Sequence, residues 1–126
     1  ELGEDEIEVG VGIHGEPGRR RAKMVSANEI VDILLDAVVP DLPFESGDKV
    51  ALMINGLGGT PISELYLLYG IAAEKLAAKG INVTRNYVGE YCTSLEMAGC
   101  SLTLVKLDDE IDALLAAPAS IVNRIF

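Results

Sequence analysis

One short stretch, IEVGVGIHGEPG (residues 7–18), holds the only histidine of the chain, His14. Imidazole serves in proteins as a nucleophile, a general base or a metal ligand. Gly12 precedes the histidine and Glu16 follows it by two residues. A carboxylate at this spacing could fix the tautomer of the ring and so orient a reactive imidazole. Because the chain has no second histidine and no cysteine near this one in sequence, we expect no metal site and interpret His14 as a nucleophile or base.

The run that leads to the histidine alternates between apolar and polar or small residues over positions 5–13, which predicts a half-buried strand. If this alternation continues, His14 shares the polar face with Gly10 and Gly12 and points away from the core. Glycine inside a strand often marks a place where something approaches the backbone closely. We therefore expect an open trough in front of the imidazole, filled by a ligand or another domain. The alternative is a surface histidine beside a turn, without function.

Two further motifs have structural interpretations. The turn NGLGGTP (55–61) lies between a strand and a helix, where anions often bind, but it lacks the lysine of a phosphate-binding loop and does not match GxGxxG. We interpret it as a tight packing turn, with Thr60 as the helix cap and Pro61 as the first helical residue. The basic run RRRAK (19–23) is interpreted as a solvated patch that could pair with acidic groups elsewhere or on a partner.

The elements that must position these motifs follow from hydrophobic periodicity. A capping box in SANE (26–29) begins a first helix that the prolines at 40 and 43 end. After NGLGGTP, an apolar stripe of Leu65, Leu68, Ala72 and Leu76 predicts a second, longer helix. A continuous apolar run at 49–55 predicts a strand covered on both faces. The remaining predicted elements are strands over 81–91 and 100–107 and a short acidic helix over 108–116.

The order of these elements is strand, helix, strand, helix, strand, strand, helix. The segment 92–99 is too short to carry a parallel crossover between the last two strands. Several strands also show one polar face, which argues against a sheet buried on both sides. The sequence therefore predicts an α/β fold, a two-layer domain with a mixed β-sheet and helices mainly on one face.

Composition limits the classes of partner. Of the 126 residues, 49% are hydrophobic and 5% aromatic, so the core of this single domain should be aliphatic. The formal charge of −10 argues against nucleic acid and anionic membrane surfaces as partners, and no apolar run reaches the roughly 20 residues of a membrane span. Cys92 and Cys100 could form one bridge in a secreted domain. We expect instead buried, reduced thiols in a cytoplasmic protein.

Four motifs along the chain carry a resemblance: VGVGIHGEPG (9–18), MINGLGGTPISELY (53–66), YCTSLEMAG (91–99) and DDEIDALLAAP (108–118). Together they resemble the dihydroxyacetone (glycerone) kinase family, in the C-terminal domain of its substrate-binding subunit. The resemblance covers the whole chain, 1–126. The acidic start ELGEDE looks like a linker or a cut site, so we expect the chain to be a fragment of a longer subunit, without its N-terminal domain.

The resemblance implies that His14 attacks the carbonyl carbon of dihydroxyacetone and holds the ketone as a covalent hemiaminal. A terminal hydroxyl then accepts a phosphoryl group, which gives dihydroxyacetone phosphate. Glycerol lacks a carbonyl and cannot be anchored in this way. The substrate-binding residues expected here are His14, Gly12 and Glu16. No metal or cofactor is expected on this domain, and ATP or ADP with magnesium would be bound by the partner domain or subunit.

The family also implies partners: the upstream N-terminal domain with a catalytic aspartate, a helical nucleotide-binding domain or subunit, and a second copy in a homodimer. The isolated fragment is expected to be inactive alone. The phosphoryl donor could be ATP, or ADP rephosphorylated by the sugar phosphotransferase relay. The ending IVNRIF (121–126), with no helical domain attached, favours a separate nucleotide-bearing subunit.

Two alternatives to a kinase subunit exist. Some relatives keep the histidine but act as ketone sensors that regulate transcription, and both classes need His14. A packing module with an idle histidine is the third hypothesis, which the family resemblance makes unattractive.

Overall fold

A three-stranded sheet forms the centre of the computed structural model, which describes residues 2–120. Strand β3 (Lys49–Gly56) is in the middle, with β4 (Asn82–Gly89) parallel to it on one side and β5 (Cys100–Leu107) antiparallel on the other. The register between β3 and β4 shifts at Val50/Ala51. The mixed sheet predicted from the short 92–99 connection is confirmed.

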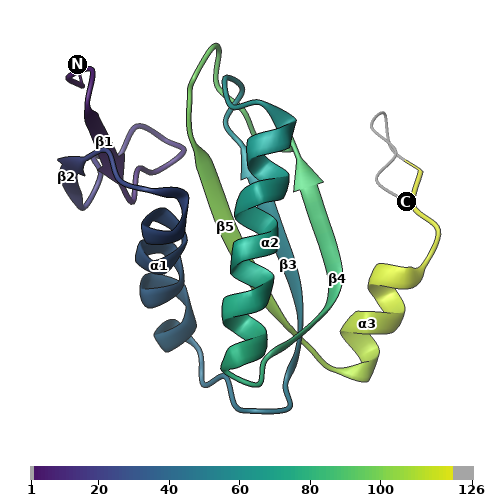
Figure 1. Cartoon of the computed structure of the whole chain (residues 1–126). Coiled ribbons are helices and arrows are strands. Elements are labelled where there is room, and N and C mark those ends of the chain that lie inside the picture. The colour runs from purple at the N-terminus through teal and green to yellow at the C-terminus, as the bar shows by residue number, and fades with distance from the viewer. Residues whose placement is uncertain (1, 121–126) are drawn as a thin grey trace.

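Two helices cover one face of this sheet (Figure 1). Helix α1 (Ala27–Val38) begins with the predicted capping box and continues into the 3₁₀ turn η1 (Val39–Asp41), and α2 (Ile62–Ala78) crosses β3 and β4. The core lies between helices and sheet and is aliphatic, as expected; its most deeply buried members are Val31, Val50, Leu52, Ile54, Leu65, Ala72 and Leu76.

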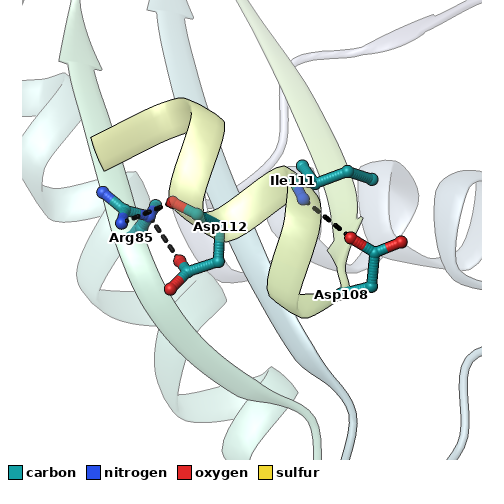
Figure 2. A network of polar contacts seen from close by, with 4 residues as sticks. All are labelled: Arg85, Asp108, Ile111 and Asp112. Atoms are coloured by element: carbon teal, nitrogen blue, oxygen red, sulfur yellow. Dashed lines mark hydrogen bonds and ion pairs between the residues drawn. The ribbon is translucent and has the colours of Figure 1, made fainter. Parts of the chain in front are cut away.

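The third helix, α3 (Asp109–Ala116), lies beside the opposite face of the sheet. Asp108 caps it by accepting a hydrogen bond from the Ile111 N–H at 2.7 Å. Arg85 of β4 holds it in place, because its Nε donates to Asp112 Oδ1 at 2.6 Å and its second guanidinium nitrogen donates to the Asp112 carbonyl at 2.9 Å (Figure 2). The predicted α/β architecture with helices mainly on one face is therefore confirmed.

The first strand departs from the prediction. It is β1 (Glu6–Val9), shorter than the expected 5–13, and it pairs antiparallel with β2 (Arg20–Lys23) in a two-stranded hairpin apart from the main sheet. Residues 20–23 of the basic run, interpreted above as a solvated patch that could pair with acidic groups, form this second strand, and Arg20, Arg21 and Lys23 are exposed as expected. Opposite charges face each other across the hairpin, in the pairs Glu6–Lys23 and Glu8–Arg21, which stabilise it.

Two further expectations concern the cysteines and membrane-spanning helices. The cysteines are unpaired thiols, but Cys92 is exposed and Cys100 only half-buried, so the expectation that both are buried was wrong. Burial raises the pKa of the Cys100 thiol. Within residues 2–120 no helix is long and apolar enough to cross a membrane. The ending IVNRIF, residues 121–126, lies outside the described residues.

Candidate functional site

His14 lies in the long loop that joins β1 to β2, residues 10–19. The strand stops at Val9 because Gly10 takes a φ of +77°, in the left-handed region that an extended strand does not use. The alternation in the sequence continues past this point, but the backbone does not follow it. His14 therefore stands in a turn, and its side chain is 80% exposed. The expectation that it points away from the core is confirmed, although a turn and not strand parity places it there.

Glu16 contacts both the backbone and the ring of His14. Its Oε2 accepts a hydrogen bond from the backbone N–H of His14 at 2.9 Å, and its Oε1 lies 3.5 Å from His14 Nδ1. Hydrogen bonds from the backbone N–H groups of Glu16 itself and of His14 keep the pKa of this carboxyl below its ordinary value. The carboxylate is thus anionic at neutral pH and faces the Nδ1 side of the ring.

Gly12 lies under the same carboxylate. Its N–H donates to the Glu16 backbone carbonyl at 3.3 Å, and a Cβ added at Gly12 would overlap the Glu16 side chain. At Gly10 an added Cβ would lie 2.8 Å from Arg19 Cγ. The open trough expected in front of the imidazole is therefore absent at both glycines, because side chains of the loop itself fill the space.

The second glycine-rich segment is built very differently. Gly58 and Gly59 lie directly against the backbone of residues 94–98, and the Gly59 N–H donates to the Met97 carbonyl at 2.8 Å. The interpretation as a packing turn is supported. Thr60 is not the helix cap, since its hydroxyl both donates to the Gly99 carbonyl and accepts from the Gly99 N–H, each at 2.9 Å, while Pro61 stands at the cap position of α2.

Sequence reasoning missed the residue that organises this end of the sheet, Asn55. It is 4% exposed, and its Oδ1 accepts from the N–H groups of Tyr91 and Cys92 at 2.7 and 2.8 Å. Its Nδ2 donates to the Cys92 carbonyl at 2.9 Å and to the Ser101 hydroxyl at 3.3 Å. A lone asparagine in the apolar run KVALMIN was the available signal, because a buried amide must find partners.

A pocket of about 270 Å³ lies elsewhere, between α3 and the second face of the sheet. It is lined by Ala51, Met53, Tyr87, Thr103, Val105, Ile111 and Leu115. This lining holds no histidine or carboxylate and does not include the His14 loop. Among residues 2–120 no three His, Cys, Asp or Glu side chains cluster in a way that could hold a metal ion. Within residues 2–120, the side chains best placed for nucleophilic or acid–base chemistry are therefore His14 and Glu16.

Comparison with known proteins identifies the family of this chain. Residues 1–123 match the Dak1 domain. Over 118 residues the chain is 42% identical to the dihydroxyacetone-binding subunit DhaK of PTS-dependent dihydroxyacetone kinase 2 from Listeria innocua, a match that covers 94% of this chain and 36% of that subunit.

Two solved structures have the same fold. The dihydroxyacetone kinase operon co-activator Dha-DhaQ superposes with a TM-score of 0.82 at 34% identity, over 90% of this chain and 36% of that one. The dihydroxyacetone kinase from C. freundii, solved with AMP-PNP and Mg²⁺, superposes with a TM-score of 0.75 at 28% identity, over 96% of this chain and 22% of that one. The chain thus spans 36% of the Listeria innocua subunit and of the co-activator, and 22% of the C. freundii kinase. Since the match extends over nearly all of its residues, the chain belongs to the Dak1 domain family.

Proposed function

We propose that this chain is the substrate-anchoring domain of a dihydroxyacetone kinase, the C-terminal domain of a substrate-binding subunit, with His14 as the anchor. The observation that carries the proposal is the His14 loop: an imidazole 80% exposed in a Dak1 domain, with a carboxylate 3.5 Å from Nδ1. Such a group can be reached by a small ketone. The name of the Listeria innocua relative, a dihydroxyacetone-binding subunit, supports this choice of ligand.

The proposed reaction is addition of the imidazole to the ketone carbonyl. Glu16 favours the tautomer with the proton on Nδ1, which leaves the lone pair on Nε2. Nε2 attacks the carbonyl carbon of dihydroxyacetone, the C=O π bond breaks, and a carbon–nitrogen bond forms. The alkoxide oxygen takes a proton from water, and Nδ1 passes its proton through Glu16 to the hydroxide left behind, so the product is a neutral hemiaminal. Glu16 lies where it can accept the Nδ1 proton, and Gly12 leaves room for that carboxylate.

The anchor alone does not complete a kinase. We propose that a further domain of the same subunit supplies the rest of the substrate pocket and that a helical domain or subunit carries ATP, or ADP, with magnesium. The C. freundii kinase bound to AMP-PNP and Mg²⁺, which matches this chain over only 22% of its length, supports a nucleotide site outside this domain. The covalent anchor would fix the terminal hydroxyl for in-line attack on the phosphoryl group. A dimeric subunit in the cytoplasm, where unpaired thiols such as Cys92 and Cys100 are usual, is part of the proposal.

A second candidate function is ketone sensing. The structural similarity to an operon co-activator, with a TM-score of 0.82, favours it specifically. Both functions use His14 in the same way, so they differ in what the rest of the protein does with the anchored ketone. Formation of dihydroxyacetone phosphate by the complete subunit, supplied with its nucleotide-bearing partner, would establish the kinase. Ketone binding without phosphorylation would establish the sensor.

The test of the anchor is a carbon NMR spectrum of the chain mixed with dihydroxyacetone labelled with ¹³C at the carbonyl. We expect a new signal in the hemiaminal region, absent from the His14→Ala variant. Because the ring is exposed, the free energy of unfolding of that variant should lie within about 0.5 kcal/mol of the parent value. The His14→Gln variant serves as the matched polar control. A carbonyl signal that the parent chain leaves unchanged, also when the rest of the subunit is present, would contradict the proposal.

A further inference from the structure

The loop that carries His14 is closed at its base by contacts between its two arms. The Arg19 N–H donates to the Val9 carbonyl at 2.7 Å, at the point where β1 ends and the chain returns to β2. Beside this bond, the Gly18 N–H donates to Oε1 of Glu8 at 2.9 Å. A side chain of β1 therefore holds the backbone of the arm that returns from His14.

The Glu8 carboxylate is closely fitted to this arm. Glu8 and Gly18 are both half-buried, and a Cβ added at Gly18 would overlap Cγ of Glu8 and lie 2.9 Å from the Val9 carbonyl oxygen. Glycine at position 18 thus permits the close approach of side chain and backbone. Because the acceptor is an ionised carboxylate, this hydrogen bond is stronger than one between neutral groups. We conclude that Glu8 fixes the backbone at Gly18.

The same arm carries Glu16, two residues before Gly18. The Glu16 side chain is 58% exposed, so its position depends on the backbone beneath it more than on packing. That position matters for His14, whose N–H donates to Glu16 Oε2 at 2.9 Å and whose Nδ1 lies 3.5 Å from Oε1. Pro17 joins Glu16 to Gly18, and its ring fixes φ, so a displacement at Gly18 is transmitted to Glu16 through a stiff link.

We propose that Glu8 is a positioning residue for the ketone anchor: by holding the Gly18 N–H, it keeps the Glu16 carboxylate beside Nδ1 of His14. This inference rests on the proposed function for its effect on ketone capture, though not for its effect on the imidazole itself. Nδ1 keeps its proton while Glu16 can accept a hydrogen bond from it. Loss of the Glu8 contact lets that proton move to Nε2, which removes the lone pair that attacks the ketone.

Glu6 supplies a matched control on the same strand. Glu6 and Glu8 are two positions apart, so their side chains leave the same face of β1, and each lies opposite a cationic residue of β2. Oε2 of Glu6 also accepts a hydrogen bond from a glycine N–H, that of Gly3, at 2.9 Å. The two carboxylates make the same kind of contact, but the Glu6 contact leads away from the His14 loop.

Three substitutions at Glu8 separate the contact from the charge. Glu8→Gln keeps an acceptor oxygen at the same reach and loses the charge. Glu8→Asp keeps the charge, but its carboxylate is one methylene too short to reach the Gly18 N–H. Glu8→Ala loses both. If Glu8→Ala unpairs β1 from β2, the Gln and Asp variants still decide, because each keeps a polar side chain opposite Arg21.

The first measurement needs no ketone. The chain is labelled with ¹⁵N at histidine and studied in mildly alkaline buffer, where imidazole is neutral, so that the two ring nitrogen shifts give the fraction of each tautomer. We expect one ratio shared by the parent, Glu8→Gln and Glu6→Ala. Glu8→Asp and Glu8→Ala should share another, with more of the form protonated on Nε2.

The second measurement is ketone capture, followed by the carbonyl-carbon signal in the presence of the rest of the subunit. Capture should fall about fivefold in Glu8→Asp and Glu8→Ala and by less than about twofold in Glu8→Gln. A tautomer shift in a chain that captures no ketone would leave the positioning role established and refute the proposed function, so the two are separable.

Three results would overturn the proposal. The first is a tautomer ratio that none of the Glu8 variants changes. The second is a Gln variant as impaired as Glu8→Ala beside an unimpaired Asp variant, which would show that the charge acts and the contact does not. The third is an equal shift in Glu6→Ala, which would show that the imidazole responds to any weakening of the hairpin.

Discussion

The chain has two glycine-rich segments, and they serve opposite purposes. In residues 55–61 the glycines let two backbones touch, because Gly58 and Gly59 lie against the loop that precedes β5. Asn55 of β3 makes three hydrogen bonds to the same loop and a fourth to Ser101 of β5. In residues 10–19 the glycines shape a turn that presents His14 to solvent and seats Glu16 beneath it. Glycine content by itself therefore does not distinguish a binding loop from a packing turn. It also does not show whether a segment is held by the core.

The two segments also differ in how much buried packing supports them. The 55–61 turn belongs to a body with a continuous buried core, whereas the His14 loop belongs to a hairpin that buries no large side chain completely. Substitutions in the body should therefore change the free energy of unfolding, and those in the hairpin should change ketone binding.

The largest difference is expected between Leu52→Ala and Ile13→Ala. Leu52 is fully buried in β3, so its truncation leaves a cavity and should cost about 3 kcal/mol or more of unfolding free energy. Ile13 is 76% exposed, and its truncation should change stability by less than about 0.5 kcal/mol. Urea unfolding followed by circular dichroism measures both. Similar losses in the two variants would mean that the hairpin is part of the core.

Asn55→Ala tests the clamp at the 55–61 turn. The substitution removes one acceptor shared by the N–H groups of Tyr91 and Cys92 and two donated hydrogen bonds, so we expect a loss of about 2 kcal/mol. The matched control is Asn86→Ala, an exposed asparagine on β4, which should cost much less. If both variants unfold at the same urea concentration, Asn55 does not organise the loop.

Gly12→Val tests the binding loop. A valine side chain would overlap the Glu16 carboxylate and displace it from His14, so ketone capture should fall about tenfold, equivalent to roughly 1.4 kcal/mol, with little change in stability. The carbonyl-carbon NMR signal reports the captured fraction. Gly70→Val is the control, since an added Cβ there meets nothing within 4 Å. Unimpaired ketone capture by the Gly12→Val variant would show that the position of the Glu16 carboxylate has no role in capture.

The smallest effect concerns pH and the body. Lys106 Nζ lies 2.7 Å from Asp48 Oδ2, and this hydrogen bond, together with one from the Glu45 N–H, holds the pKa of the Asp48 carboxyl below its ordinary value. A carboxyl with a lowered pKa in the folded state stabilises it above the unfolded pKa of about 3.9 and loses that contribution as pH falls through the folded value.

Asp48→Asn should therefore destabilise the chain at pH 7 and make no such difference once the pH lies well below the ordinary aspartate value. Urea midpoints of parent and variant across this range measure the effect, and Lys106→Met should reproduce it. A gap between parent and Asp48→Asn that stays constant down to the lowest pH would contradict this linkage.

Much of the body could be predicted from sequence because its signals are local. All four residues of the expected α2 stripe, Leu65, Leu68, Ala72 and Leu76, are buried, and the capping box of α1 forms as predicted. The hairpin could not be predicted in the same way. Strand β2 reads Arg-Arg-Ala-Lys, with no apolar alternation, and only its pairing with the acidic β1 makes it a strand.

The site divides along the same line. Residue types identified His14 and Glu16 as neighbours, and their spacing in the chain is short enough for the contact to be local. The expected trough is absent because Gly10 adopts a left-handed φ and ends the strand before its alternation extends to His14. The roles of Asn55 and Thr60 depend on residues 91–101, more than thirty positions away, and no local pattern encodes such contacts.

A one-bond nitrogen–carbon correlation spectrum would show directly whether the exposed imidazole bonds to a ketone. The chain would be labelled with ¹⁵N at histidine, which marks His14 alone, and mixed with dihydroxyacetone labelled with ¹³C at the carbonyl, in the presence of the rest of the subunit. We predict a correlation between one imidazole nitrogen and a carbon in the hemiaminal region. A hemiaminal carbon without that coupling, or no adduct carbon at all, would show that His14 does not anchor the ketone.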